Sequence, residues 1–149
     1  PSKDFSNVRL NRDVLYDYYL LHVAHASRMP AEFYVHHFTH NMAFLQEDNN
    51  DSYTYLRLGI LVGFIKAKNT GYVKEAMTEF RKELSNVLPP KLFKKADSYI
   101  SEYVNMSVDD LNQERTDYIH KIENAIARVK KDEYGIKEEL IRIKQLIQF

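Results

Sequence analysis

Apolar residues recur three and four positions apart along almost the whole chain, and no stretch alternates between apolar and polar residues as a half-buried strand does. Spacing of three and four places side chains on one face of an α-helix. Only four glycines and four prolines interrupt the pattern. The sequence therefore predicts an all-α protein, organised as a single domain over residues 1–149.

Capping and turn residues divide the first two thirds of this pattern into five helices. Asn11 or Asp13 is expected to cap the first helix, and Pro30 suits the first turn of the second. The polar run EDNNDS ends the second helix, and Asp51 or Ser52 within it is expected to cap the third. The predicted helices cover about 12–27, 30–47, 53–68, 72–88 and 91–105, and together they form a helical bundle from 12 to 105.

The third predicted helix is apolar on nearly all sides between Leu56 and Ile65, so we expect it to lie at the centre of the bundle. Gly59 and Gly63 lie four residues apart on one of its faces. Because glycine has no side chain, a neighbouring helix or an aromatic ring can approach the backbone closely at these two positions.

The last helical region opens at Ser107, where SVDD resembles a capping box with Asp110 in the place of the usual glutamate or glutamine. We expect residues 107–149 to form either one long amphipathic, coiled-coil-like helix or a pair of helices that breaks at Gly135. Glycine costs about 1 kcal/mol in a helix interior, which favours the break. No residue that typically starts a helix follows Gly135, which favours the long helix.

Eight aliphatic residues in this region occupy the a and d positions of a heptad repeat, the pattern of a coiled coil. They are Ile119, Ile122, Ile126, Val129, Ile136, Leu140, Ile143 and Ile147, and Glu133 occupies a ninth position. Acidic g positions, Asp132 and Glu139, precede lysines at e positions, Lys137 and Lys144, as in parallel paired chains. We therefore expect a homo-oligomer, dimer or trimer, with the eight residues as its interface. Alternatively the stripe packs on the protein's own bundle, where helices use the same packing geometry.

Charge and composition narrow the functional classes. Lysine plus arginine and aspartate plus glutamate both number 21, and a net charge of zero argues against a protein whose main task is to bind nucleic acid. The absence of cysteine excludes disulfides and thiolate chemistry. The N-terminal segment lacks the apolar core of a signal peptide, and the longest apolar run, 58–65, is too short to cross a bilayer. We expect a soluble cytoplasmic protein with no cofactor, no membrane association and a protein partner.

Five of the six histidines lie in the segment HVAHASRMPAEFYVHHFTH. His36 and His40 are four residues apart, the spacing that places two imidazoles on one helix face for a single metal ion. With His22 from the preceding helix and Glu32 or Glu47 as an oxygen donor, they could form a zinc or iron site. No HExxH motif and no cysteine accompanies them, so we favour packing or interface roles for these histidines.

The segment RTDYIH places an arginine, Arg115, four intervening residues before a histidine, His120. This spacing resembles the ribonuclease motif of the HEPN family of small all-α domains. The resemblance implies a dimeric endoribonuclease with Arg115 and His120 as its catalytic residues. Thr116 follows the arginine where that motif commonly has asparagine.

No glycine-rich phosphate loop, nucleophile elbow or dinucleotide fingerprint occurs in the chain. We therefore predict a non-enzymatic protein–protein interaction or adaptor module that self-associates through its C-terminal helix. The alternative is a small all-α enzyme, either a HEPN-like endoribonuclease or a metal-dependent enzyme at the histidine cluster.

Overall fold

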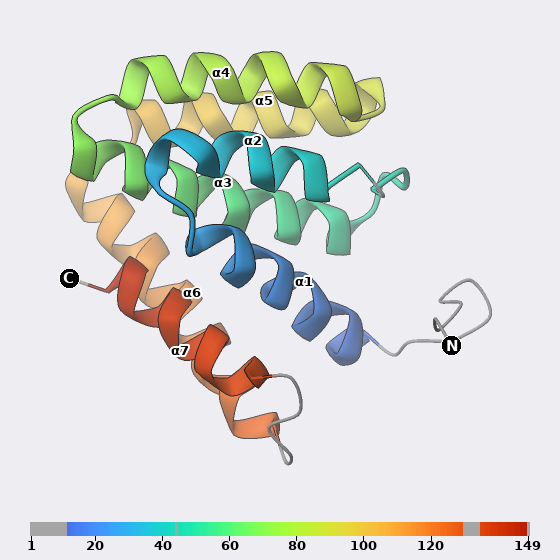
Figure 1. Cartoon of the computed structure of the whole chain (residues 1–149), viewed down its shortest axis with the longest axis vertical. Coiled ribbons are helices and arrows are strands. Elements are labelled where there is room, and N and C mark those ends of the chain that lie inside the picture. The colour runs from blue at the N-terminus through green and yellow to red at the C-terminus, as the bar shows by residue number, and fades with distance from the viewer. Residues whose placement is uncertain (1–11, 44, 130–134, 149) are drawn as a thin grey trace.

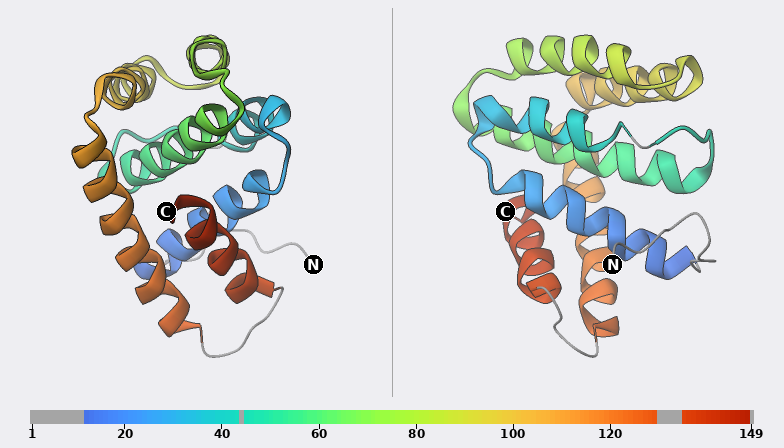
Figure 2. Two further views of the ribbon diagram at one scale, coloured as in Figure 1. Left: turned by 90° about the vertical axis from the view of Figure 1, so that its left-hand side faces the viewer. Right: turned by 45° about the vertical axis from the view of Figure 1, so that its right-hand side comes forward.

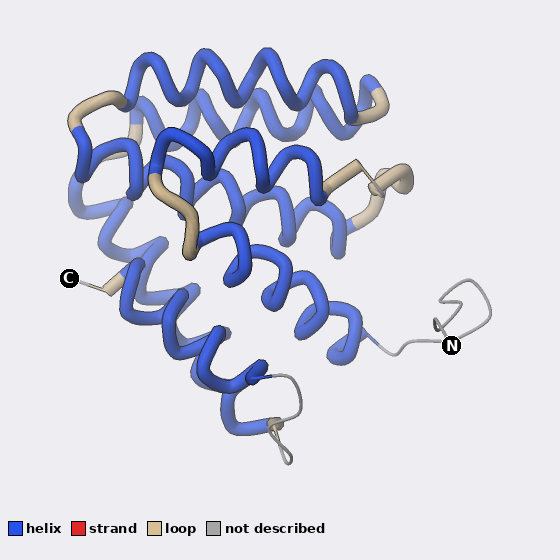
Figure 3. Tube along the Cα trace, in the orientation of Figure 1, coloured by secondary structure: helices blue, strands red, loops and turns tan. Residues whose placement is uncertain are grey.

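The computed structural model describes residues 12–43, 45–129 and 135–148 (Figure 1). Every regular element in these residues is an α-helix, so the protein is all-α (Figure 3). The described helices are α1 (Arg12–Ser27), α2 (Ala31–Asn41), α3 (Asn50–Thr70), α4 (Val73–Val87), α5 (Pro90–Asn105), α6 (Val108–Arg128) and α7 (Ile136–Ile147). Helix α1 has the predicted bounds, and α4 and α5 begin and end within one residue of the prediction.

Helix α3 lies at the centre of the molecule, as its apolar circumference predicts. It packs against α1, α2, α4 and α5 and also touches α7. Figure 2 shows α4 and α5 side by side above α3, with α1 crossing below it. One hydrophobic cluster includes side chains from all seven of these helices. None of the described helices is both long and apolar enough to cross a membrane.

Two glycines let aromatic rings reach the backbone of α3, as predicted. A Cβ atom at Gly59 would overlap the ring of Phe38 from α2, and one at Gly63 would lie 2.9 Å from Cζ of Phe80 from α4. The Tyr34 hydroxyl donates a hydrogen bond of 2.7 Å to the Gly59 carbonyl. Because this hydroxyl is buried, the bond satisfies a polar group that would otherwise destabilise the core.

Helix α2 ends at Asn41, about six residues earlier than predicted. The Met42 N–H donates to the carbonyls of both Phe38 and Thr39, at 3.1 Å each, and the Leu45 N–H donates to the Met42 carbonyl at 2.9 Å. These bonds tighten the chain into turns that leave the helix. Met42 and Leu45 are nevertheless buried, so a loop satisfies the apolar spacing that predicted a longer helix.

Asn49, rather than Asp51 or Ser52, caps α3. Its side-chain oxygen accepts a hydrogen bond from the Ser52 N–H at 2.9 Å, which corrects the predicted cap by two to three residues. Of the two residues predicted to cap α1, Asn11 lies outside the described residues, as does the side chain of Asp13.

Arg57 joins α3 to α5 and α6. Its guanidinium donates to the Glu102 carboxylate of α5 at 2.9 Å and to the Glu114 carboxylate of α6 at 2.6 Å. The Tyr103 hydroxyl donates to the same Glu114 carboxylate at 2.7 Å. The hydrogen bond from Arg57 lowers the pKa of Glu102, and burial raises the pKa of Tyr103. The hydrogen bond from Arg57 therefore favours the charged form of Glu102.

The C-terminal region is a pair of antiparallel helices, α6 and α7, that lie side by side (Figures 1 and 2). Ser107 caps α6 as predicted, and its hydroxyl accepts from the Asp110 N–H at 3.1 Å. Gly135, with a φ of 70°, directly precedes α7 in the left-handed conformation that glycine adopts without strain. The prediction of one long coiled-coil-like helix is therefore wrong, and the alternative of a helix pair is correct. Two residues of the heptad pattern, Asp132 and Glu133, lie outside the described residues.

The aliphatic seam of this region packs within the chain. Ile122, Leu140, Ile143 and Ile147 are completely buried, and Ile119, Ile126, Val129 and Ile136 are partly buried against the same core. Two of the flanking charges that the heptad pattern assigned to a second chain also have partners here. Glu139 accepts from Arg28, the residue that follows α1, at 2.7 Å, and Lys144 lies 3.4 Å from Glu123 of α6. Helices α1 and α6 therefore pack against α7 and bury the aliphatic residues that the heptad pattern assigned to an interface with another copy of the chain.

Candidate functional site

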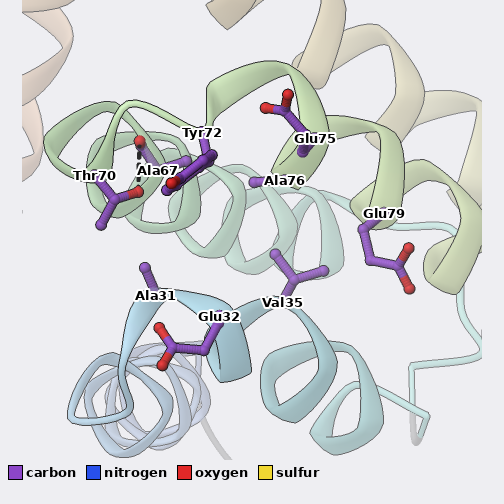
Figure 4. Close-up of a pocket in the computed structure, with 9 residues that line it drawn as sticks. All are labelled: Ala31, Glu32, Val35, Ala67, Thr70, Tyr72, Glu75, Ala76 and Glu79. Carbon is purple, nitrogen blue, oxygen red and sulfur yellow. Dashed lines mark hydrogen bonds between the residues drawn. The ribbon is translucent and has the colours of Figure 1, made fainter.

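An acidic pocket of about 470 Å³ opens between α2, the end of α3 and the start of α4 (Figure 4). Its volume falls in the range of ligand-binding clefts. We call it the acidic pocket, and it is lined by Ala31, Glu32, Val35, Ala67, Thr70, Tyr72, Glu75, Ala76 and Glu79. Figure 4 shows Val35 and Ala76 reaching into the space between α2 and α4, with Tyr72 on one side of them and Glu79 on the other.

Local structure explains how these residues are placed. Gly71, with a φ of 82°, ends α3 in the left-handed conformation, and Tyr72 follows it immediately before α4. This sharp turn leaves Tyr72, which lines the acidic pocket, 65% exposed. The Thr70 hydroxyl donates to the Ala67 carbonyl at 3.0 Å, so its hydrogen-bonding capacity is partly used within the helix end.

Three carboxylates and no basic side chain line the acidic pocket. Glu32 and Glu75 lie in the first turns of α2 and α4, where a negative charge is stabilised by the helix dipole. Glu79 lies one turn after Glu75 on the same helix, and like charges at this spacing destabilise a helix by about 0.2–0.5 kcal/mol. Within the described part of the chain, no lysine or arginine forms an ion pair with any of the three. The helix dipole therefore accounts for Glu32 and Glu75, but not for Glu79.

The acidic pocket suits a ligand that is both cationic and partly apolar. Val35 is buried at its floor and, with the alanines, offers methyl groups for apolar contact. The exposed ring of Tyr72 can face a cation, and Glu32 on one side of Val35 or Glu79 on the other can neutralise a positive charge. The Glu75 carboxylate points away from Val35 at the outer rim (Figure 4). Lysine and arginine side chains combine an apolar stem with a charged head and match this arrangement.

The histidine cluster is split between two faces of the molecule. His22, His25 and His37 line an open pocket of about 520 Å³ between α1, α2 and α7, together with Arg28 and Glu139. The His25 and His37 rings are 6.4 Å apart. Burial, and secondly the nearby His25, lower the pKa of His22, so this imidazole stays neutral near neutral pH.

The other two histidines of the predicted metal set, His36 and His40, lie on the side of α2 that faces α4. His36 Nδ1 is 2.9 Å from Glu83 Oε1 on α4, and the His36 and His40 rings are 6.2 Å apart. Glu47 lies in the loop after α2, where it accepts from Asn49 at 3.2 Å. The structure thus pairs His36 with His40 but places His22 in a different pocket. No three His, Asp or Glu side chains of the described residues are positioned to hold one metal ion.

Arg115 and His120, the pair that resembles the ribonuclease motif, both lie on α6. Arg115 is partly buried on the face that carries Leu111 and Tyr118, whereas His120 is exposed. Five residues of α-helix rotate the side chain by about 140° beyond a full turn, so the two point in different directions from one helix. Neither residue lines the acidic pocket or the pocket between α1, α2 and α7.

Sequence reasoning missed the acidic pocket, because its residues come from positions 31–35 and 67–79 and no local motif joins them. Two signals were present in the sequence. Glu75 and Glu79 are like charges on one helix face, and Tyr72 is a large aromatic residue directly after a glycine that ends a helix.

Comparison of the chain with known protein families, curated proteins and solved structures finds no match.

Proposed function

We propose that this protein is an interaction module whose acidic pocket binds a basic, amphipathic segment of another protein. The observation that carries the proposal is the grouping of three glutamates, without a basic partner in the described residues, around the apolar floor formed by Val35 and its alanine neighbours. A lysine or arginine of the bound segment would lay its stem on this floor and its charge against Glu32 or Glu79, which lie on opposite sides of Val35 (Figure 4). A neighbouring apolar residue of the segment would contact Tyr72.

The interaction role expected from the sequence is thus assigned to the acidic pocket, and not to the heptad seam. Because four of the eight seam residues are completely buried by the chain's own helices, the seam offers little surface to a second copy. The acidic pocket, in contrast, exposes both its aromatic residue and its charges. Electrostatic complementarity of this kind favours a partner of opposite charge and speeds association.

Fluorescence anisotropy with a labelled amphipathic peptide of leucine and lysine tests the proposal, with the same peptide carrying glutamate for lysine as the comparison. We expect the basic peptide to bind and the acidic one not to bind. Each exposed ion pair contributes about 0.2–1 kcal/mol, so the E32Q/E79Q double variant should bind about twofold to about thirtyfold more weakly. Ala76→Gln should weaken binding independently of charge, because the longer side chain fills the floor.

Glu138→Gln is the matched control, since Glu138 is an exposed glutamate in the first turn of α7, far from the acidic pocket along the chain. It should bind the basic peptide as the wild type does. Equal binding of the acidic peptide, or full binding by E32Q/E79Q, would refute the proposal. Light scattering reports whether a second copy fills the pocket instead. If the wild type is a dimer and the E32Q/E79Q variant is a monomer, the pocket binds a second copy of the chain, and the proposal that it binds a different protein is wrong.

A further inference from the structure

A second candidate site lies at the other end of the contact between α2 and α4. His36 and His40 project from successive turns of α2, with ring planes inclined by only 17° and centroids 6.2 Å apart. Both residues are exposed, and the His36 side chain is 76% accessible. Two parallel imidazoles one helical turn apart are the arrangement in which a helix can chelate a single metal ion.

Glu83 determines which nitrogen of His36 is available. Its Oε1 atom lies 2.9 Å from His36 Nδ1, and an ionised carboxylate only accepts hydrogen bonds. The proton of the neutral ring must therefore be on Nδ1, which leaves the Nε2 lone pair free and directed away from Glu83. Metal-binding histidines typically donate their second ring N–H to a carboxylate in this way, which orients the ring and makes it a stronger ligand.

The surroundings of the pair favour a cation. His36, Thr39, His40, Glu83 and Asn86 share a cavity of about 170 Å³, which Val87 also lines. The second carboxylate oxygen of Glu83 is buried and has no hydrogen-bond partner in the described residues, and the same holds for the Thr39 hydroxyl. The Glu83 side chain is 18% exposed, so its charge is only partly screened by water. The cavity therefore contains a carboxylate whose charge is not fully compensated.

We propose that His36 and His40 form a chelating site for a divalent transition-metal ion of the Cu²⁺, Ni²⁺ or Zn²⁺ class, with Glu83 as a positioning residue. Imidazole ligands select these ions over Mg²⁺ and Ca²⁺, which prefer oxygen. Two protein ligands leave the remaining coordination positions to water, so the ion stays accessible to a donor group from another molecule. His36, His40 and Glu83 do not line the acidic pocket, so this proposal does not rest on the one made for that pocket.

Isothermal titration of the untagged full chain with NiCl₂, and separately with ZnCl₂, tests the proposal. We expect one ion per chain at this site. His36→Asn and His40→Asn should each weaken binding by at least about tenfold, because a single imidazole loses the advantage of a second ligand held nearby. Both positions are exposed, so thermal unfolding of the metal-free variants should match the wild type.

His120→Asn is the control, because His120 is an exposed histidine on α6 without a histidine one turn away. It should bind metal with wild-type affinity. Wild-type affinity in the H36N/H40N double variant would overturn the proposal. Loss of binding in H22N/H37N with full binding in H36N/H40N would also overturn it, because the ion would then occupy the pocket between α1, α2 and α7.

The role of Glu83 has its own readout. Glu83→Ala should weaken metal binding by about tenfold to a hundredfold, the typical effect of removing a carboxylate behind a histidine ligand. Glu83→Gln should restore part of the loss, because its amide oxygen can still accept the Nδ1 proton. Long-range ¹H–¹⁵N spectra of the imidazoles report the tautomer directly. A His36 ring protonated on Nε2 in the metal-free protein would contradict the assignment.

Discussion

Replacing Gly59 with alanine should destabilise the protein, although alanine is the better helix former. Even Cε1, the farthest of the three Phe38 ring atoms nearest to a Cβ at this position, would lie 2.5 Å from it, well inside van der Waals contact. The ring cannot move away easily, because Phe38 is completely buried among three other aromatic rings. The centroid of its ring lies 5.7, 5.4 and 6.0 Å from the ring centroids of Tyr34, Tyr55 and Phe80. Overpacking of this kind costs about 1–3 kcal/mol, and sometimes more.

The helix propensity gained by replacing glycine with alanine offsets about 1 kcal/mol of this cost. Since the overlap involves three ring atoms in a closed core, we take the upper end of the range and expect a net loss of about 2 kcal/mol in the free energy of unfolding. Urea denaturation followed by circular dichroism measures it. With a slope of about 2 kcal/mol per molar urea, the midpoint should fall by about 1 M.

Making the same substitution in a Phe38→Leu variant separates the steric cause from any other. In Phe38→Leu the ring atoms that overlap the new Cβ are absent, so Gly59→Ala should be neutral or stabilising by up to about 1 kcal/mol there. The change of sign between the two backgrounds is the decisive result. If Gly59→Ala destabilises both by the same amount, or stabilises the wild type, the account of a ring seated against bare backbone is wrong.

Two further predictions concern polar groups. The Glu114 side chain is 17% exposed and that of Glu102 is 48% exposed. Glu114→Gln should therefore lower the free energy of unfolding by about 2 kcal/mol, and Glu102→Gln by less than about 1 kcal/mol, both measured by urea denaturation. Equal losses would show that burial does not strengthen the Glu114 interaction. The pKa of His22 lies below its ordinary 6.5, so the unfolded state binds more protons and stability should fall as the pH drops below that value. His22→Gln should make this decline shallower in thermal unfolding between about pH 5 and 8, and an unchanged decline would assign it to other groups.

Local signals predicted most of the fold because they act through neighbouring residues. The Ser107 cap and the helix-starting Pro30 determine helix ends within a few residues of themselves. The end of α2 escaped prediction, because Met42 and Leu45 are buried at helical spacing although both lie beyond Asn41, the last residue of the helix. Apolar spacing reports which residues are buried, and a loop can bury them as well as a helix can.

The same patterns do not indicate which residues distant in the sequence come into contact. The heptad spacing identified Ile122, Leu140 and Ile143 as buried residues, but a helix hairpin that packs on α1 uses the same spacing as a coiled coil between chains. Likewise, His36 and Glu83 are 47 residues apart in sequence, and only the packing of α2 on α4 brings them together. The histidine spacing could indicate a chelating pair, but not the carboxylate behind it.

The two proposed sites lie at opposite ends of a single helix pair. Residues 31–35 of α2 face the start of α4 in the acidic pocket, and residues 36–40 face its end at the histidine pair, so α2 and α4 run parallel across both (Figure 1). A ligand that changes the spacing or tilt of these helices at one end alters the geometry available at the other. Thermodynamic linkage then requires the effect to be mutual: if metal ion strengthens peptide binding by some factor, peptide strengthens metal binding by the same factor. In that case the contact between α2 and α4 would couple the two sites, so that the affinity for one ligand depends on whether the other is bound.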